Sequence, residues 1–296
     1  MSFTEIKIPI SWGHIAGKAW GNISDPLVMV LHGYQDNAGS FDKLIPLLPT
    51  TYYYVCLDLP GHGKSSHIPT PTFISFVDFI YTLKYTLDYF NRKKYILLGH
   101  SYGAQTCLIF TQIFPAYVSK LITLDAIHYL PISPKNCIPF LRQIITRYEK
   151  LHHLDPKTAP SYELEEAVQK MTEQRMAQIS DESMKIIMQR SLIPQPDGRY
   201  KISLAQHLKY NIAAPMSLSY FASLLKHHPI KCPHLSIIVS ESATFKQIAK
   251  ESFDQLRENK NFEEIVVEGH HDVHVEHPDR VAPIISAFLV KQHSKL

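Results

Sequence analysis

Short apolar runs rich in β-branched residues alternate with longer segments of helical period along much of the chain. An unbroken apolar run is typical of a strand buried on both faces, and its alternation with helices is typical of βαβ units. The pattern therefore predicts an α/β fold, with a mostly parallel twisted sheet and helices on both of its faces. The expected strands cover residues 27–31, 52–57, 95–98, 121–124, 235–239 and 264–267, after a hairpin over residues 6–20.

This alternation stops in the middle of the chain. Residues 127–226 follow a helical pattern with proline-rich breaks, and Ile138, Leu141 and Ile145 fall on one helical face. About a hundred residues is a plausible size for a subdomain. We therefore expect residues 1–126 and 227–296 to form an α/β core, and residues 127–226 to form an inserted helical cap.

The overall charge and hydropathy narrow the class of protein. The 296 residues carry a net charge of only +3, with Lys and Arg dispersed, so we expect no nucleic-acid partner. No apolar run approaches the roughly 20 residues that a membrane-spanning helix needs, so we expect no membrane span.

One pentapeptide carries candidate chemistry: Gly99-His100-Ser101-Tyr102-Gly103. It follows an expected buried strand and precedes a helical segment, which is the setting of a nucleophile elbow. Such a sharp turn exposes the serine hydroxyl, and the flanking glycines remove side chains that would clash in it. The spacing predicts that Ser101 is a catalytic nucleophile.

A serine hydroxyl is a weak nucleophile, so it needs a base and a group that orients that base. Near the end of the chain, residues 269–278 read GHHDVHVEHP and contain four histidines. His270 and His274 would share a face if the segment were helical, which raises a metal site as an alternative. Gly269 and Pro278 favour a loop instead, and the spacing matches no common metal-ligand pattern. We therefore expect no metal and no cofactor.

Together these motifs make the chain resemble the α/β-hydrolase superfamily, and within it the serine hydrolase-like group that includes the insect Kraken-type proteins. The resemblance covers nearly the whole chain and is weaker in the insertion. It is carried by PISWGHIA at residues 9–16, LHGYQDN at 31–37, DLPGHGKSS at 58–66, the pentapeptide at 99–103, and HDVHVEHP at 271–278.

The resemblance implies an α/β-hydrolase fold and specific roles for three further residues. It selects His271 as the base, with His270 at a spacer position. It also implies an oxyanion hole made by the backbone N–H groups of Tyr34 and Tyr102. Two fixed donors of this kind stabilise the charge that develops on a carbonyl oxygen during acyl transfer.

The acid of the expected triad departs from the family pattern. Most of the superfamily has the catalytic aspartate at the position that Ser242 occupies in this chain. A serine side chain cannot ionise, so Ser242 cannot be the acid. A minority takes the acid from the end of the preceding strand, which here is Asp125. We favour Asp125 as the catalytic acid, and Glu241 remains the alternative.

These residues predict a serine hydrolase of the carboxylesterase or thioesterase type, which cleaves a hydrophobic or acyl substrate through an acyl-enzyme on Ser101. The alternative is a catalytically weak hydrolase-fold protein that binds a small ligand. The last three residues, Ser294, Lys295 and Leu296, match a peroxisomal targeting signal. They predict binding to the peroxisomal import receptor and a peroxisomal location, with the cytoplasm as the alternative.

Overall fold

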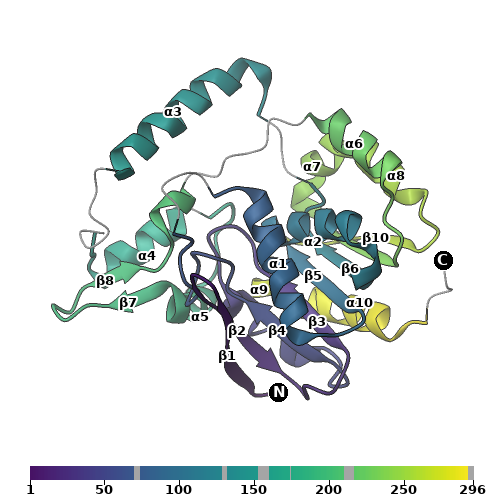
Figure 1. Cartoon of the computed structure of the whole chain (residues 1–296), viewed down its shortest axis with the longest axis horizontal. Coiled ribbons are helices and arrows are strands. Elements are labelled where there is room, and N and C mark those ends of the chain that lie inside the picture. The colour runs from purple at the N-terminus through teal and green to yellow at the C-terminus, as the bar shows by residue number, and fades with distance from the viewer. Residues whose placement is uncertain (70–73, 129–131, 153–159, 174, 210–216, 293–296) are drawn as a thin grey trace.

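The computed structural model describes residues 1–69, 74–128, 132–152, 160–173, 175–209 and 217–292 (Figure 1). Its centre is an eight-stranded sheet with the order β1-β2-β4-β3-β5-β6-β9-β10. The strands are β1 (Phe3–Ile10), β2 (Gly13–Trp20), β3 (Leu27–Leu31), β4 (Tyr53–Leu57), β5 (Tyr95–His100), β6 (Val118–Leu124), β9 (His234–Val239) and β10 (Phe262–Val267).

Six neighbouring strands, from β4 to β10, are parallel, and β1 and β2 extend the sheet as an antiparallel hairpin. Of these parallel strands, β3, β4, β5 and β9 are buried throughout and β6 is buried at its end, which explains their continuous apolar sequences. The predicted α/β class, with its mostly parallel sheet, is confirmed.

Helices cover both faces of the sheet. One face packs against α1 (Phe76–Phe90), α2 (Tyr102–Ile113), α6 (Leu218–His227) and α8 (Lys250–Arg257), and the other against α10 (Pro278–Val290) and short turns around Phe41 and Ile45. Large side chains such as Phe79, Phe110 and Phe253 are fully buried. Each contributes about 1.5–3 kcal/mol through burial, so the two layers of side chains hold the sheet in place.

Helix α1 shows how the local sequence sets the ends of these elements. The Asp78 carboxylate accepts the Ser75 backbone N–H at 2.7 Å, as in a capping box. At the other end Asn91 has φ 49°, a left-handed conformation that Asn tolerates and that stops the helix.

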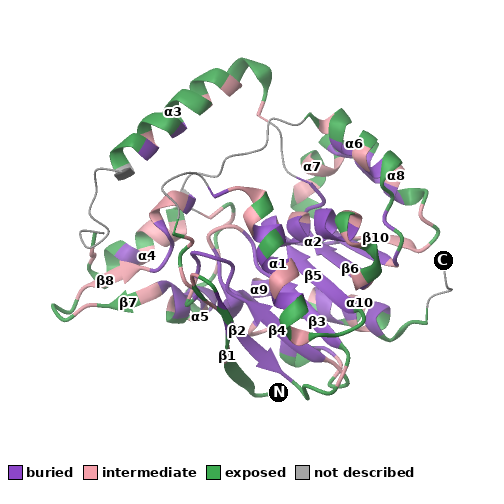
Figure 2. Ribbon diagram, in the orientation of Figure 1, coloured by how far each residue is buried: buried purple, intermediate pink, exposed green. Residues whose placement is uncertain are grey.

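Between β6 and β9 the chain forms α3 (Pro134–His152), α4 (Leu164–Glu173), α5 (Asp181–Ser191) and a small hairpin of β7 (Leu192–Pro194) and β8 (Tyr200–Ile202). The hairpin was not expected from the helical pattern, because three-residue strands are too short to show a period. Figure 2 shows α3 as largely exposed, in contrast to the buried sheet. Helix α6 packs against α8, so this last part of residues 127–226 lies with the core helices.

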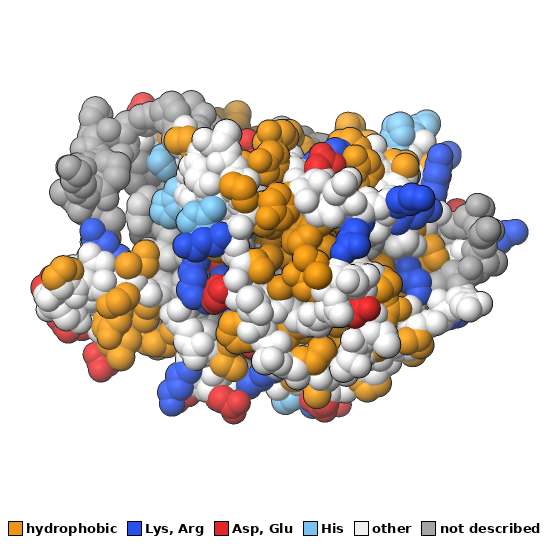
Figure 3. All heavy atoms as spheres, turned by 60° about the horizontal axis from the view of Figure 1, so that its bottom comes forward, with side chains coloured by type: hydrophobic (Ala, Val, Ile, Leu, Met, Phe, Trp, Pro, Cys, Tyr) orange, Lys and Arg blue, Asp and Glu red, His pale blue; other side chains and the backbone are white. Residues whose placement is uncertain are grey.

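No helix within the described ranges is long and apolar enough to span a membrane. On the face shown in Figure 3, Lys and Arg side chains lie scattered among acidic ones and around a central band of hydrophobic side chains. This face is therefore mixed in character rather than an array of one charge sign.

Candidate active site

Ser101 occupies the sharp turn between β5 and α2. Its backbone has φ 51° and ψ −117°, a combination that is costly for a residue with a side chain and is held here by the surrounding structure. A Cβ on Gly103 would lie 2.3 Å from the Leu31 carbonyl oxygen, and one on Gly99 would lie 2.5 Å from the Ala104 nitrogen. Both glycines are therefore required for the turn, in agreement with the interpretation of the pentapeptide.

His271 follows β10 and meets Asp125, which follows β6. The His271 Nδ1 and Asp125 Oδ2 atoms are 2.6 Å apart, and the Asp125 side chain is almost completely buried. Because a carboxylate only accepts hydrogen bonds, Nδ1 carries the proton and Nε2 is left as the acceptor. The structure thus brings together His271 and Asp125, the residues expected as base and acid.

The Asp125 carboxylate is held by two more donors. Its Oδ1 accepts the Val239 backbone N–H at 3.1 Å, and its Oδ2 accepts the Ser242 hydroxyl at 2.7 Å. Ser242, at the position where the family pattern has its acid, therefore supports Asp125 instead of replacing it. The neighbouring Glu241 has an exposed side chain, and within the described part of the chain its carboxylate makes no ion pair with His271.

The two tyrosines expected at the oxyanion hole lie beside the nucleophile. A Cβ on Gly33 would lie 3.3 Å from the Ser101 Cβ, so the loop after β3 passes directly against Ser101 before it reaches Tyr34. Tyr102 is the first residue of α2, where backbone N–H groups have no acceptor within the helix. The centroids of the Tyr34 and Tyr102 rings are 5.5 Å apart, so the two side chains lie next to each other.

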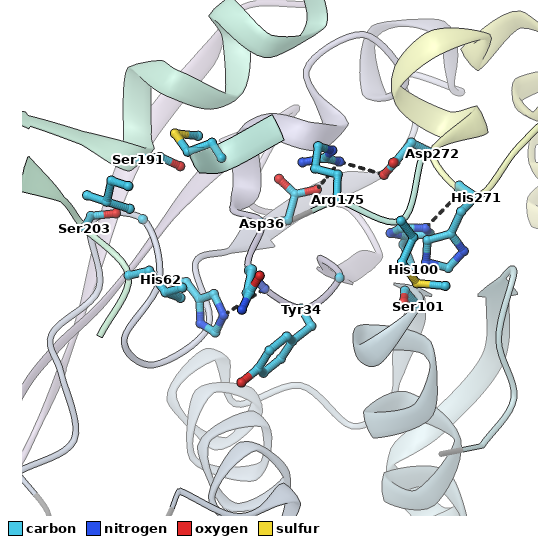
Figure 4. Close-up of a pocket in the computed structure, with 17 residues that line it drawn as sticks. Tyr34, Asp36, His62, His100, Ser101, Arg175, Ser191, Ser203, His271 and Asp272 are labelled. Carbon is cyan, nitrogen blue, oxygen red and sulfur yellow. Dashed lines mark hydrogen bonds and ion pairs between the residues drawn. The ribbon is translucent and has the colours of Figure 1, made fainter. Parts of the chain in front are cut away.

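Ser101 and His271 line one cavity of about 150 Å³, and His62 and His100 line it as well (Figure 4). Side chains from the inserted residues form another part of its wall. They are Met171, Arg175, Met176, Ser191, Ile202, Ser203 and Leu204. The site thus combines polar groups at the strand ends, where α/β proteins usually bind ligands, with a partly apolar wall from the insertion.

A model of the alpha/beta hydrolase fold family matches residues 26–278 of this chain. The chain is also 31% identical to serine hydrolase-like protein 2 of Homo sapiens, over 98% of this chain and 95% of the human protein. The chain belongs to the alpha/beta hydrolase family. Its predicted place in the serine hydrolase-like group of that family is confirmed.

Two solved structures show how far the fold of this hydrolase is shared. The hypothetical protein PA1622 from Pseudomonas aeruginosa PAO1 has a TM-score of 0.84 at 23% identity, over 97% of this chain and 99% of that one. The thioesterase domain from the curacin biosynthetic pathway has a TM-score of 0.78 at 19% identity, over 96% and 99% of the two chains. At these identities the likeness establishes the fold and nothing more.

Two further histidine rings, those of His100 and His274, lie close to His271. The His100 Nε2 donates a hydrogen bond to the His271 carbonyl oxygen at 2.9 Å, and the His100 ring lies 4.6 Å from His271 and 4.0 Å from His274. Burial lowers the pKa of His100 well below its usual range, and burial lowers the pKa of His274 to about 3. Both rings are therefore neutral near pH 7, and His100 supports the backbone of His271 without adding charge.

A charged cluster that was not expected from the sequence also faces the cavity. The Arg175 guanidinium is 2.7 Å from Asp272 and 3.4 Å from Asp36. Asp36 and Asp272 could have been noticed beside Tyr34 and His271, but Arg175 lies 139 and 97 residues away from them in the chain. No pattern in the sequence links such distant positions.

The four histidines at residues 270–277 had raised a metal site as an alternative. Among the residues that the structure describes, no group of three or more His, Cys, Asp or Glu side chains is arranged to hold a metal ion.

Proposed function

We propose that this hydrolase cleaves carboxylic esters or thioesters through an acyl-enzyme on Ser101. The observation that carries the proposal is the 2.6 Å contact of His271 with the buried Asp125, at a cavity that Ser101 also lines. A serine in an elbow, a histidine with a free Nε2 and a buried orienting carboxylate are the parts that acyl transfer needs.

In the proposed reaction, the Ser101 oxygen attacks the substrate carbonyl carbon while His271 Nε2 takes the hydroxyl proton. The backbone N–H groups of Tyr34 and Tyr102 stabilise the oxyanion of the tetrahedral intermediate. The protonated His271 then gives its proton to the departing alcohol or thiol, which leaves the acyl group on Ser101. Water attacks this ester with His271 again as base, and the acid is released with Ser101 restored.

The size of the cavity supports a short acyl group. A cavity of about 150 Å³ is the size that holds a benzene molecule, so it accommodates an acyl chain of about six carbons. Met171, Ile202 and Leu204 supply an apolar wall for that chain. The similar fold of a thioesterase domain agrees with a thioester as one substrate form, at the level of analogy.

A fluorophosphonate probe, which reacts with activated serines, tests the proposal. We expect the wild-type protein to be labelled, the Ser101→Ala variant to be unlabelled, and the control Ser24→Ala, which removes an exposed hydroxyl, to react like the wild type. Esters and thioesters of graded chain length should then show highest kcat/KM at or below about six carbons. Folded wild-type protein that is neither labelled nor active on any of these substrates would favour the ligand-binding alternative.

That alternative was motivated by the missing acid at position 242. The contact between Asp125 and His271 counts against it, because the base has a buried carboxylate partner from another strand.

Peroxisomal import through Ser294, Lys295 and Leu296 stays a prediction. These three residues lie outside the described part of the chain.

A further inference from the structure

The Arg175 cluster joins three buried charges at the wall of the cavity. Arg175 lies between α4 and α5, and its Nη2 reaches both the Asp272 Oδ1 and the Asp36 Oδ2. The Arg175 side chain is 11% exposed, and the two aspartates are 4–5% exposed. Figure 4 shows the guanidinium between the two carboxylates.

Each aspartate belongs to a different part of the proposed catalytic machinery. Asp272 directly follows His271, on the loop after β10. Asp36 is two residues after Tyr34, on the loop after β3. In the sheet, three strands lie between β3 and β10, so no backbone pairing joins these two loops directly. Among the interactions described for these loops, Arg175 is the side chain that contacts both aspartates.

The cost of burying these charges indicates that they serve more than stability. Removing a charge from water is expensive, and a buried ion pair is often no more stabilising than well-packed apolar side chains would be. Burial raises the pKa of Asp36, although Arg175 opposes this shift. A cluster of this kind is favoured where it sets a geometry that apolar contacts would leave less well defined.

The contacts of the guanidinium favour a positioning role. Both ion pairs described for Arg175 are made with aspartates of the two loops, while its side chain also lines the cavity. The Arg175 Nε is buried and has no hydrogen-bond partner among the described residues. Helix α5 of the insertion also contacts the loop after β3. The Asn37 side-chain amide donates hydrogen bonds to the Ile187 carbonyl oxygen and the Ser191 hydroxyl.

We propose that Arg175 is a positioning residue, which holds the loop of His271 and the loop of Tyr34 in the relative position that acyl transfer requires. The inserted segment then completes the active site in addition to covering it. This inference rests on the proposed serine hydrolase function. Because a displacement of about 1 Å in a catalytic group can cost about 100-fold in rate, a small relaxation of either loop has a measurable effect.

The variants must separate this role from simple stability. Arg175→Gln alone would leave two buried carboxylates without a partner and could unfold the protein. The combination Arg175→Met, Asp36→Asn and Asp272→Asn removes all three charges together and avoids that problem. Arg175→Lys keeps a single cation and tests rescue. Arg199→Gln is the matched control, because Arg199 pairs with the exposed Glu163 away from the cavity.

The readouts are thermal unfolding, the fluorophosphonate labelling rate, and kcat and KM on a short-chain ester. For the triple variant we expect a folded protein whose kcat falls about 100-fold while KM changes by less than about threefold. Arg175→Lys should recover part of this loss, and Arg199→Gln should behave like the wild type. If the triple variant does not fold, Arg175→Lys carries the test, with a loss in kcat at unchanged melting temperature expected.

Three results would overturn the inference. A folded variant with the kcat of the wild type would show that the loops keep their places without Arg175. A loss confined to KM would show instead that Arg175 contacts the substrate. A wild-type protein that neither reacts with the probe nor hydrolyses an ester would overturn the proposed function, and the inference with it. Activity in the wild type with unchanged variants would overturn the inference alone.

Discussion

Replacing Asp125 by Asn should nearly abolish hydrolysis, and the surrounding hydrogen bonds explain why. The Val239 backbone N–H donates to the Asp125 Oδ1, so an asparagine would place its carbonyl oxygen there. Its NH₂ group would then face the His271 Nδ1, where the carboxylate now accepts. The imidazole would have to carry its proton on Nε2, in the tautomer that cannot accept a proton from Ser101.

The expected size of this effect is a drop in kcat of about 10⁴, as when the orienting acid of a serine triad becomes an amide. That factor corresponds to about 5.5 kcal/mol in the activation barrier. The fold should persist, because asparagine has the shape of aspartate and the Ser242 hydroxyl can rotate to accept a bond from the new NH₂ group.

The assay is steady-state hydrolysis of a short-chain p-nitrophenyl ester, with circular dichroism to verify folding. Glu241→Gln is the matched control, and its kcat should equal that of the wild type because its side chain is exposed. The reasoning fails if Asp125→Asn retains kcat within about tenfold of the wild type, or if Glu241→Gln shows the larger loss.

Three further predictions follow from other parts of the molecule. Ser242→Ala removes one hydrogen bond to the Asp125 carboxylate, so kcat should fall by about tenfold, far less than in Asp125→Asn; an equal loss would contradict this. Burial lowers the pKa of His234 to about 3, so below about pH 6.5 the unfolded chain binds a proton at this residue that the folded protein does not bind. The free energy of unfolding should therefore decrease as the pH is lowered below about 6.5. In His234→Gln, whose side chain can still hydrogen-bond to Thr123, the free energy of unfolding in urea should depend less on pH, with a slope lower by about 1.4 kcal/mol per pH unit between pH 6 and 4. The prediction is refuted if the free energies of unfolding of the variant and the wild type change with pH at the same slope. A fluorescent protein fused at the N-terminus should appear in peroxisomal puncta and disperse when residues 294–296 are deleted; diffuse signal from the intact fusion would contradict the prediction.

Much of the fold could be predicted because its signals are local. Each buried strand is a short apolar run. The turn at Ser101 is encoded by five adjacent residues, and its backbone geometry requires the two glycines among them. The hairpin of β7 and β8 was missed because its strands are three residues long. The role of Ser242 was missed for a different reason, since a serine at an acid position looked like a defect until its contact with Asp125 was seen.

The sequence by itself predicted the α/β class and Ser101 as the nucleophile, because each prediction depends on residues close together in the chain. The two candidate acids, Asp125 and Glu241, came from the resemblance to the family. Only the tertiary structure placed Asp125 against His271, 146 residues away, since the order of the parallel strands decides which loops meet. It alone also placed Arg175 between Asp36 and Asp272. Contacts between distant segments depend on how the elements pack in three dimensions, and this packing produces no local pattern in the sequence.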